Sequence, residues 1–165
     1  MANGKKIKAV SLFAGCGGLD LGFTKEGFDI IWANDYDHWA CETYKRNFGA
    51  HVVEGDITTL DLNKIPRADI ILGGFPCQDF SMLWKRGGIN ADRGNLYRYF
   101  VNIVKASEPK MFIAENVRGL LSANAGKAIK QIVADFAKTG KYGFDVEVHP
   151  INFANYGAPQ LRERV

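Results

Sequence analysis

Cys77, which follows a short apolar run, is the residue of this 165-residue chain whose type and position most clearly indicate chemical reactivity. The run at 69–72 (Asp-Ile-Ile-Leu) is typical of a strand covered on both faces, and the two glycines after it allow a close turn. Pro76 stiffens the approach and restricts Phe75 to extended geometry, so Cys77 is held at the end of the strand. On this stretch alone, a nucleophile and a small buried hydrophobe both remain open interpretations.

Carboxylates follow three other predicted strands. Glu115 comes directly after the apolar run 111–114, and Asp35 follows the strand predicted at 28–33. Asp35 also lies about twenty residues past a glycine-rich turn, where a doubly wound fold places a ribose-binding acid. Asp37 is interpreted as the cap of the next helix, whereas Asp56, after the strand at 51–53, either contacts a ligand or shapes its loop.

The glycine-rich turn at 14–18 (Ala-Gly-Cys-Gly-Gly) connects a strand predicted at 7–13 to a helix with apolar residues at 19 and 23. Glycines at such a turn let backbone N–H groups and the helix N-terminus approach a ligand closely. The dinucleotide fingerprint G-x-G-x-x-G is not met, because its third glycine would fall on Asp20. The turn therefore predicts a nucleotide-like ligand other than NAD, with a plain tight turn as the alternative.

The remaining pattern alternates helices with strands. Apolar stripes predict helices through 40–48, 96–104 and 129–136, and alternating residues predict a half-exposed strand within 142–149. Residues 79–94 lack apolar periodicity and are typical of a long binding loop or lid. We expect an α/β fold with a doubly wound, mostly parallel sheet, so the strand ends that carry Asp35, Cys77 and Glu115 meet at one edge.

Composition sets the broad class of protein. The length fits one domain, and Cys16, Cys41 and Cys77 have neither disulfide nor metal-ligand spacing, so no metal is expected. The sparse cysteines indicate a reducing, intracellular setting, cytoplasmic if prokaryotic. We also predict a soluble protein, because glycines interrupt the N-terminal apolar stretch too early for a signal peptide or membrane span. A net charge of +3 permits a polyanionic partner without requiring one.

Four motifs in order along the chain resemble those of the DNA cytosine-5 methyltransferases. They are Ser-Leu-Phe-Ala-Gly-Cys-Gly-Gly at 11–18, Gly-Phe-Pro-Cys-Gln at 74–78, Glu-Asn-Val at 115–117 and Gln-Leu-Arg-Glu-Arg at 160–164. One motif alone would be weak, but four in register at the expected strand ends are specific. The resemblance implies the Rossmann-like fold of S-adenosylmethionine-dependent methyltransferases.

The resemblance also implies how S-adenosylmethionine would be held. Phe13 would lie against the adenine, Asp35 on the ribose hydroxyls, Tyr36 near the adenine and Asp56 towards its amino group. Many relatives have an aspartate where this chain has Ser11, which affects any contact of that side chain. The cofactor-binding set implied by the resemblance is Phe13, Ala14, Gly15, Cys16, Gly17, Gly18, Asp35, Tyr36, Asp56, Ile57 and Pro76.

For catalysis, the resemblance implies that the Cys77 thiolate attacks C6 of cytosine, because C5 alone is a poor nucleophile. Glu115 would hold or protonate N3 of the ring, and Asn116 would buttress it. Arg162 and Arg164 alternate in an extended segment, so both would project to one side towards the base oxygen and nearby backbone.

The expected partner is double-stranded DNA, from which the target cytosine must be flipped out of the stack. The DNA-binding residues on the lid would be Gln78, Ser81, Lys85 and Arg93. Neither Cys16 nor Cys41 is placed for the second-cysteine mechanism of many RNA cytosine-5 methyltransferases, which favours DNA. The alternatives are a tRNA cytosine-5 methyltransferase and a non-catalytic subunit that binds cofactor or DNA.

Full-length relatives continue past the Arg-x-Arg motif into a further strand, a target-recognition region and a return segment. We therefore expect residues 1–165 to form a partial S-adenosylmethionine-binding catalytic domain, incomplete at its C-terminal end. The chain would be either a fragment or one part of an enzyme whose second polypeptide carries the recognition region. The isolated chain would then be unstable or aggregate, because an edge of its sheet lacks a neighbour.

Overall fold

The computed structural model describes residues 6–76 and 96–165, which form two compact units. The first unit contains the chain up to Gly74 and residues Asn102–Ala114, and the second contains Phe75–Val101 and Glu115–Val165.

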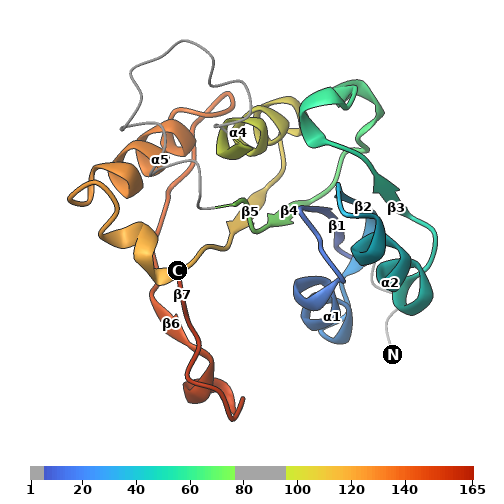
Figure 1. Cartoon of the computed structure of the whole chain (residues 1–165). Helices are drawn as coiled ribbons and strands as arrows, with labels where there is room; N and C mark the ends of the chain where they lie inside the picture. The colour runs from blue at the N-terminus through green and yellow to red at the C-terminus, as the bar shows by residue number, and fades with distance from the viewer. Residues whose placement is uncertain (1–5, 77–95) are drawn as a thin grey trace. The chain divides into compact units, whose positions relative to one another are not determined.

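The first unit contains a five-stranded parallel sheet with the order β3-β2-β1-β4-β5 (Figure 1). This order confirms the predicted doubly wound α/β fold, because the sheet grows in one direction from β1 to β3 and in the other from β4 to β5. The strand bounds are β1 Lys8–Leu12, β2 Asp29–Asp35, β3 Val52–Glu54, β4 Ile70–Gly73 and β5 Met111–Ala114.

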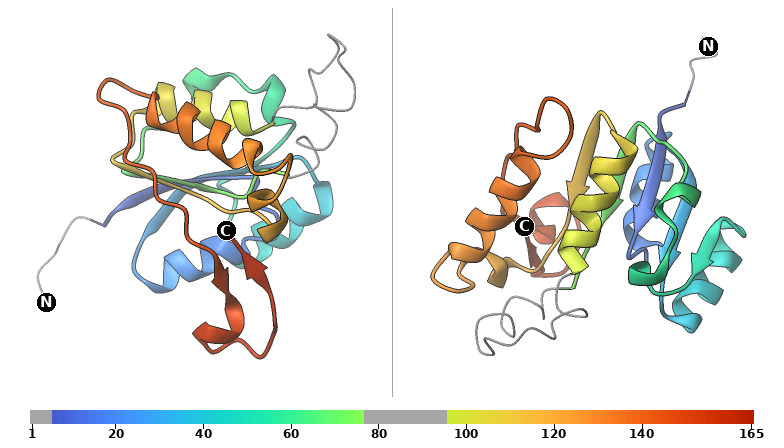
Figure 2. Two further views of the ribbon diagram at one scale, coloured as in Figure 1. Left: turned by 90° about the vertical axis from the view of Figure 1, so that its left-hand side faces the viewer. Right: turned by 90° about the horizontal axis from the view of Figure 1, so that it is seen from above.

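Helices cover both faces of this sheet. The connections from β1 to β2 and from β2 to β3 contain α1 (Gly18–Lys25) and α2 (His38–Phe48), which lie on the same face (Figure 2). The C-terminal half of α4 (Leu96–Ser107) belongs to the same unit and lies over the opposite face. The usual right-handed crossover between parallel strands predicts this arrangement, since the sheet grows in opposite directions on the two sides of the β1–β4 pair.

The two central strands, β1 and β4, form the interior of the sheet. All four residues of β4 are buried, as are the last four of β1, which matches their near-continuous apolar sequences. One core cluster of the sheet joins Ala9, Ile30, Ile70 and Leu72, and α1 packs on it through Leu19 and Phe23. This packing fixes the loop between β1 and α1 at the carboxyl edge of the sheet.

The second unit has an aromatic core. Phe100 of α4 is fully buried and makes edge contacts with Phe75 and with Phe136 of α5 (Lys127–Ala137), at ring-centroid distances of 6.0 and 5.6 Å. The Tyr97 hydroxyl donates a 3.0 Å hydrogen bond to Asp135, which ties α4 to α5 again. Phe75 is thereby anchored two positions before Cys77.

A short antiparallel hairpin closes the described chain. Strands β6 (Ile151–Asn152) and β7 (Glu163–Arg164) pair with each other and flank a 3₁₀ helix at Phe153–Tyr156. The prediction of a strand within 142–149 is wrong, because this segment pairs with no other strand in the described part of the chain. The predicted alternation holds for the first residues, since Phe144 and Val146 are half-buried and the residue after each of them is exposed, but Val148 is exposed as well. A strand also needs a hydrogen-bonded neighbour, which alternation does not supply.

Candidate functional site

The loop between β1 and α1 has a backbone conformation that few residues adopt. Gly15 and Gly17 have φ angles of +54° and +87°, and Phe13 also has a positive φ of +54°. A left-handed conformation is strained for an aromatic residue, and such strain is concentrated at functional sites. Added Cβ atoms at Gly15 and Gly18 would meet nothing within 4 Å, so space is open on this side of the loop.

The carboxylate of Asp35, at the end of β2, holds this loop. One oxygen accepts a 2.7 Å hydrogen bond from the Gly15 N–H, and the other accepts a 2.9 Å bond from the Asp37 N–H. A backbone bond from Ala14 N–H to Asn34 O, 2.9 Å long, runs beside them. Asp35 is only 8% exposed, so its carboxylate is held in place beside the glycine loop. The sequence predicted that these two features lie close together.

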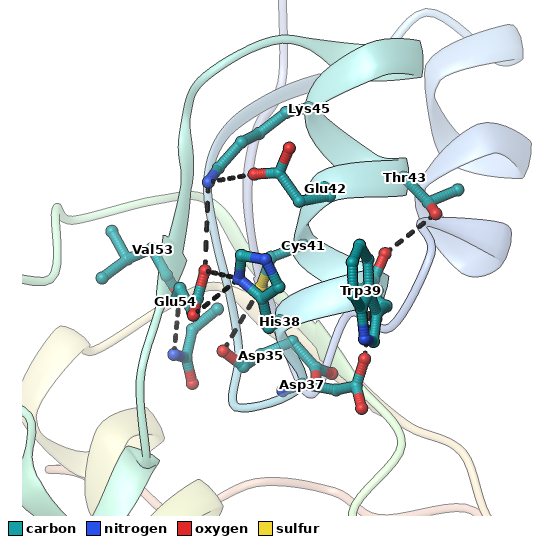
Figure 3. A network of polar contacts seen from close by, with 12 residues as sticks. Asp35, Asp37, His38, Trp39, Cys41, Glu42, Thr43, Lys45, Val53 and Glu54 are labelled. Carbon is teal, nitrogen blue, oxygen red and sulfur yellow. Dashed lines mark hydrogen bonds and ion pairs between the residues drawn. The ribbon is translucent and has the colours of Figure 1, made fainter.

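The helix that follows Asp35 begins as predicted. The Asp37 side chain accepts a 2.7 Å hydrogen bond from the Ala40 N–H, which confirms it as the N-cap of α2 (Figure 3). Tyr36, between the two acids, is 74% exposed, and Trp39 in the first turn of α2 is 75% exposed. Two aromatic rings are therefore accessible next to the carboxyl end of β2.

The polar network behind Asp35 is structural. Figure 3 shows Glu54 of β3 between His38, whose Nδ1 lies 3.1 Å away, and Lys45, whose Nζ lies 4.0 Å away. The buried thiol of Cys41 contacts the Asp35 carbonyl oxygen at 3.5 Å. Burial, followed by the negative charge of Asp35, raises the pKa of Cys41, so this thiol stays protonated.

Asp56 and Ile57 follow β3 and shape the next loop. The Asp56 carboxylate accepts a 2.9 Å hydrogen bond from the Thr58 N–H and caps a short 3₁₀ helix at Ile57–Thr59. The Ile57 side chain is buried. Asp56 is exposed, so its carboxylate faces solvent while it also performs the loop-shaping role that sequence analysis left open.

Gly17 is required by close packing as well as by its backbone angle. A Cβ at this position would lie 2.4 Å from a ring carbon of Phe48, the last residue of α2. The ring of Phe48 also packs on Tyr44 at a centroid distance of 4.8 Å, so it has little freedom to move away. The end of α2 therefore supports the glycine loop directly.

We expect Gly17→Ala to lower the free energy of unfolding by about 2 kcal/mol or more, because the clash adds to the cost of a positive φ. The matched control is Gly22→Ala in the middle of α1, where an added Cβ meets nothing within 4 Å. This control should stabilise the chain by roughly 0.5–1 kcal/mol through helix propensity. Urea denaturation measures both, and equal stabilities for the two variants would contradict the packing described here.

In the second unit, Asn116 joins the residues before Cys77 to the Glu-Asn-Val motif. Its side-chain amide donates a 2.8 Å hydrogen bond to the Phe75 carbonyl oxygen and accepts a 2.9 Å bond from the Val117 N–H. Its backbone exchanges two hydrogen bonds of 2.8 and 3.0 Å with Val165. Asn116 is 4% exposed, so three segments meet at one buried residue.

Glu115 pairs with one of the two predicted arginines. The Arg164 Nε lies 2.6 Å from the Glu115 carboxylate, and β7 is held beside this segment by a bridge between Val117 and Arg164. Arg162 instead places its guanidinium over the ring of Phe153, 5.8 Å from the centroid. The structure thus brings Glu115, Asn116 and Arg164 together and leaves Arg162 on the hairpin.

An ion pair that sequence analysis did not identify supports the same contact. Glu163 and Arg118 form a salt bridge between the hairpin and the 3₁₀ helix at Arg118–Leu121. The partners are 45 positions apart, so no local pattern signals the pair. It places a second charged contact beside the pair of Glu115 and Arg164.

Five of the predicted site residues lie outside the ranges that the structure describes. Cys77, Gln78, Ser81, Lys85 and Arg93 lie outside the described residues, and Pro76 is the last residue described before them. Cys16 is exposed within the glycine loop. Within 6–76 and 96–165, no group of three His, Cys, Asp or Glu side chains is arranged to hold a metal ion. No helix in these ranges has the length and apolar character needed to cross a membrane.

Solved structures share this fold. The Dnmt2 methyltransferase of S. pombe superposes with a TM-score of 0.75 at 21% identity, over 96% of this chain and 49% of that one. A putative DNA modification methyltransferase encoded within a prophage of E. coli gives a TM-score of 0.77 at 27% identity, over 96% and 45% of the two chains. These similarities identify the fold as that of the Rossmann-like methyltransferases.

Sequence relatives are closer. Type II methyltransferase M.NgoFVII of Neisseria gonorrhoeae is 55% identical over 166 residues, which are 99% of this chain and 44% of that protein. Type II methyltransferase M.AquIA of Picosynechococcus sp. is 38% identical over 96% of this chain and 69% of its own length. The sequence profile described as C-5 cytosine-specific DNA methylase matches residues 7–165. This chain therefore belongs to the C-5 cytosine-specific DNA methylase family.

Proposed function

We propose that this chain is the cofactor-binding and catalytic part of an enzyme that transfers a methyl group from S-adenosylmethionine to C5 of a cytosine in double-stranded DNA. The observation that carries the proposal is the hydrogen bond from the Asn116 amide to the Phe75 carbonyl. This bond connects the segment that leads to Cys77 with the segment that carries Glu115. Cys77 and Glu115 are the two groups that the reaction needs. Family membership supports this choice of reaction.

The first unit fits the cofactor. The positive φ of Phe13, the open space over Gly15 and Gly18 and the buried Asp35 carboxylate form a cradle for a nucleoside with a charged tail. Asp35 would accept from the ribose hydroxyls, and the exposed ring of Tyr36 would lie near the adenine. S-adenosylmethionine, when bound, supplies a methyl group on a positively charged sulfur.

The thiolate of Cys77 would form a bond to C6 of the cytosine. As that bond forms, the π electrons of the C5–C6 double bond shift onto C5 and, by conjugation through C4, onto N3. C5 would then be nucleophilic enough to take the methyl group, and the electron pair of the broken sulfur–methyl bond would stay on the sulfur. Afterwards the C5 proton leaves to a base and the C–S bond breaks, which restores the aromatic base and the thiolate. Cys77 is therefore unchanged over the whole cycle.

Glu115 would stabilise the charge that this attack places on the ring. A carboxyl group hydrogen-bonded or donating to N3 draws electrons away from C6 and makes the attack easier. Arg164 lies 2.6 Å from Glu115 and orients it, and Asn116 fixes the backbone on the adjacent position. The arginine also supplies a positive charge near the base oxygen.

The target base would have to leave the DNA stack to reach Cys77, since C5 and C6 are covered in a duplex. We propose that Gln78, Ser81, Lys85 and Arg93 contact the DNA from the segment after Cys77. Arg162, exposed on the hairpin, would contact neighbouring DNA backbone. These contacts fix position and carry no sequence preference themselves.

Sequence recognition would come from protein outside these residues. The chain spans 44% of M.NgoFVII, so more than half of that relative has no counterpart here. We propose that a continuation of the chain or a second polypeptide supplies the target-recognition region. The direct test is transfer of labelled methyl groups to duplex DNA and to tRNA, with the chain alone and with the flanking or co-encoded protein. Labelling of 5-methylcytosine in DNA supports the proposal, and labelling confined to tRNA contradicts it.

For the cofactor site, we expect Asp35→Ala to weaken S-adenosylmethionine binding by about 1–3 kcal/mol, because ribose hydroxyls and the Gly15 N–H both lose a charged acceptor. Asp37→Ala is the matched control, since it removes a helix cap and should cost about 1 kcal/mol of stability with little change in affinity. Cys77→Ala should also bind normally. Calorimetry that gives Asp35→Ala the affinity of the unmodified chain would place the cofactor elsewhere.

A further inference from the structure

The most completely buried charged group in the described chain has no part in the mechanism above. Asp20, in the first turn of α1, has no exposed surface. Its two carboxylate oxygens accept hydrogen bonds of 2.6 Å from the Ser11 hydroxyl and 2.7 Å from the Tyr44 hydroxyl. A buried carboxylate is costly unless its oxygens are satisfied in this way, so the cluster needs an explanation.

The bond between Ser11 and Asp20 closes the glycine loop. Ser11 is the last residue but one of β1, and Asp20 is the third residue of α1. The loop at 13–17 lies between them, so its two ends cannot separate while this buried bond is intact. Ser11 is itself only 1% exposed, and water therefore does not compete for the bond.

Tyr44 connects the hydrogen-bonded pair of Ser11 and Asp20 to the next helix, α2. Its ring is fully buried, its hydroxyl donates to Asp20, and its oxygen lies 3.1 Å from Nε2 of His51. Because the single hydroxyl proton points to Asp20, the phenolic oxygen accepts from the Nε2–H form of His51. The Asp20 carboxylate on α1 thus bonds to β1 and α2, and Tyr44 extends the network to His51, the residue before β3.

The charge state of the cluster fits this arrangement. Burial raises the pKa of Asp20, while the hydrogen bonds from Ser11 and Tyr44 and the nearby His51 act in the opposite direction. Burial and the neighbouring Asp20 raise the pKa of Tyr44, so its hydroxyl stays protonated and remains a donor. An aspartate at the third position of a helix is also favoured by the helix dipole.

We propose that Asp20 is a positioning residue for the cofactor loop, and that Ser11 and Tyr44 act through it to hold Phe13, Gly15 and Gly17 in their binding conformation. The inference rests on the proposed function, because it assigns the loop to S-adenosylmethionine. It also gives the buried serine at position 11 a role, because its hydroxyl donates to the acid at position 20. A strained loop of this kind persists only when its surroundings determine it.

The test compares three conservative variants, Ser11→Ala, Tyr44→Phe and Asp20→Asn, with the exposed control Asp29→Asn at the start of β2. Each is made in the full chain with its accompanying protein, and S-adenosylmethionine affinity is measured by calorimetry at a temperature where thermal melts show the variant to be folded. We expect Ser11→Ala and Tyr44→Phe each to raise Kd about tenfold, and Asp29→Asn to leave it unchanged.

Two further readouts separate positioning from stability. The KM for S-adenosylmethionine should rise with Kd while kcat at saturation changes less than about threefold, because the loop acts before chemistry. The double variant Ser11→Ala with Asp20→Asn should bind S-adenosylmethionine no more weakly than Asp20→Asn alone. Both substitutions act on the same hydrogen bond, between Ser11 and Asp20, so their effects should not add. If Asp20→Asn fails to fold, the two milder variants decide.

Outcomes of this experiment point in distinct directions. Lower melting temperatures with unchanged Kd in Ser11→Ala and Tyr44→Phe would show that the cluster is only structural and would overturn the inference. An unmodified protein that does not bind S-adenosylmethionine at all would overturn the proposed function, and the inference with it.

Discussion

Replacing Cys77 with serine is expected to lower the rate of methyl transfer by about a thousandfold or more. A serine hydroxyl remains protonated at neutral pH, so it cannot form the bond to C6 that makes C5 nucleophilic. The measurement is kcat for incorporation of labelled methyl groups into duplex DNA, made with any accompanying protein present. The largest single effect in the enzyme should fall on this residue.

Binding provides the control for this variant. S-adenosylmethionine affinity should be unchanged in Cys77→Ser, since the groups proposed to hold the cofactor belong almost entirely to the loop after β1 and the ends of β2 and β3. Loss of both activity and cofactor affinity would mean that the substitution damages the fold. A Cys77→Ser enzyme with more than a tenth of the normal kcat would contradict the nucleophile assignment.

The second large effect is expected for Glu115→Gln, which should reduce kcat by about a hundredfold to ten-thousandfold. The amide keeps the size of the side chain, but it can neither deliver a proton to N3 nor carry the charge that pairs with Arg164. The loss should appear in kcat more than in KM for DNA, because the interaction strengthens as charge develops on the ring.

Glu163→Gln is the matched control for this substitution. Glu163 is also a glutamate paired with an arginine in the same unit, but its partner is Arg118 and its side chain is 46% exposed. An exposed ion pair contributes little, so kcat should stay within a few-fold of normal. Equal losses of kcat in the two variants would indicate that the hairpin, and not the acid at position 115, limits the reaction.

Local sequence patterns predicted most of the first unit. Apolar runs located all five strands of the sheet, and the helix after Asp37 begins where a capping aspartate precedes a helical stripe. The glycine loop and Asp35 were placed together because the order of strands and helices in a doubly wound fold brings their ends to one edge. These features depend on short-range chemistry and on one topological rule.

Features that depend on distant partners were not predictable. The hydrogen bond from Asn116 to Phe75 spans 41 positions, and that from Tyr44 to Asp20 spans 24. Neither bond can be predicted from the local periodicity of the sequence. The positive φ of Phe13 follows from the support around the loop and not from the residue type. The expected strand within 142–149 failed for the same reason, because alternation shows exposure but not which strand lies alongside.

The most direct test of the account uses duplex DNA with 5-fluorocytosine at the target position. Fluorine at C5 cannot leave as a proton, so the bond between the enzyme and C6 should persist after methyl transfer. In the presence of S-adenosylmethionine and any accompanying protein, we expect a stable protein–DNA adduct whose tryptic peptide carries the modified base on Cys77. An adduct that still forms in Cys77→Ser, or its complete absence from the unmodified enzyme under conditions where cofactor and DNA both bind, would contradict the central claim.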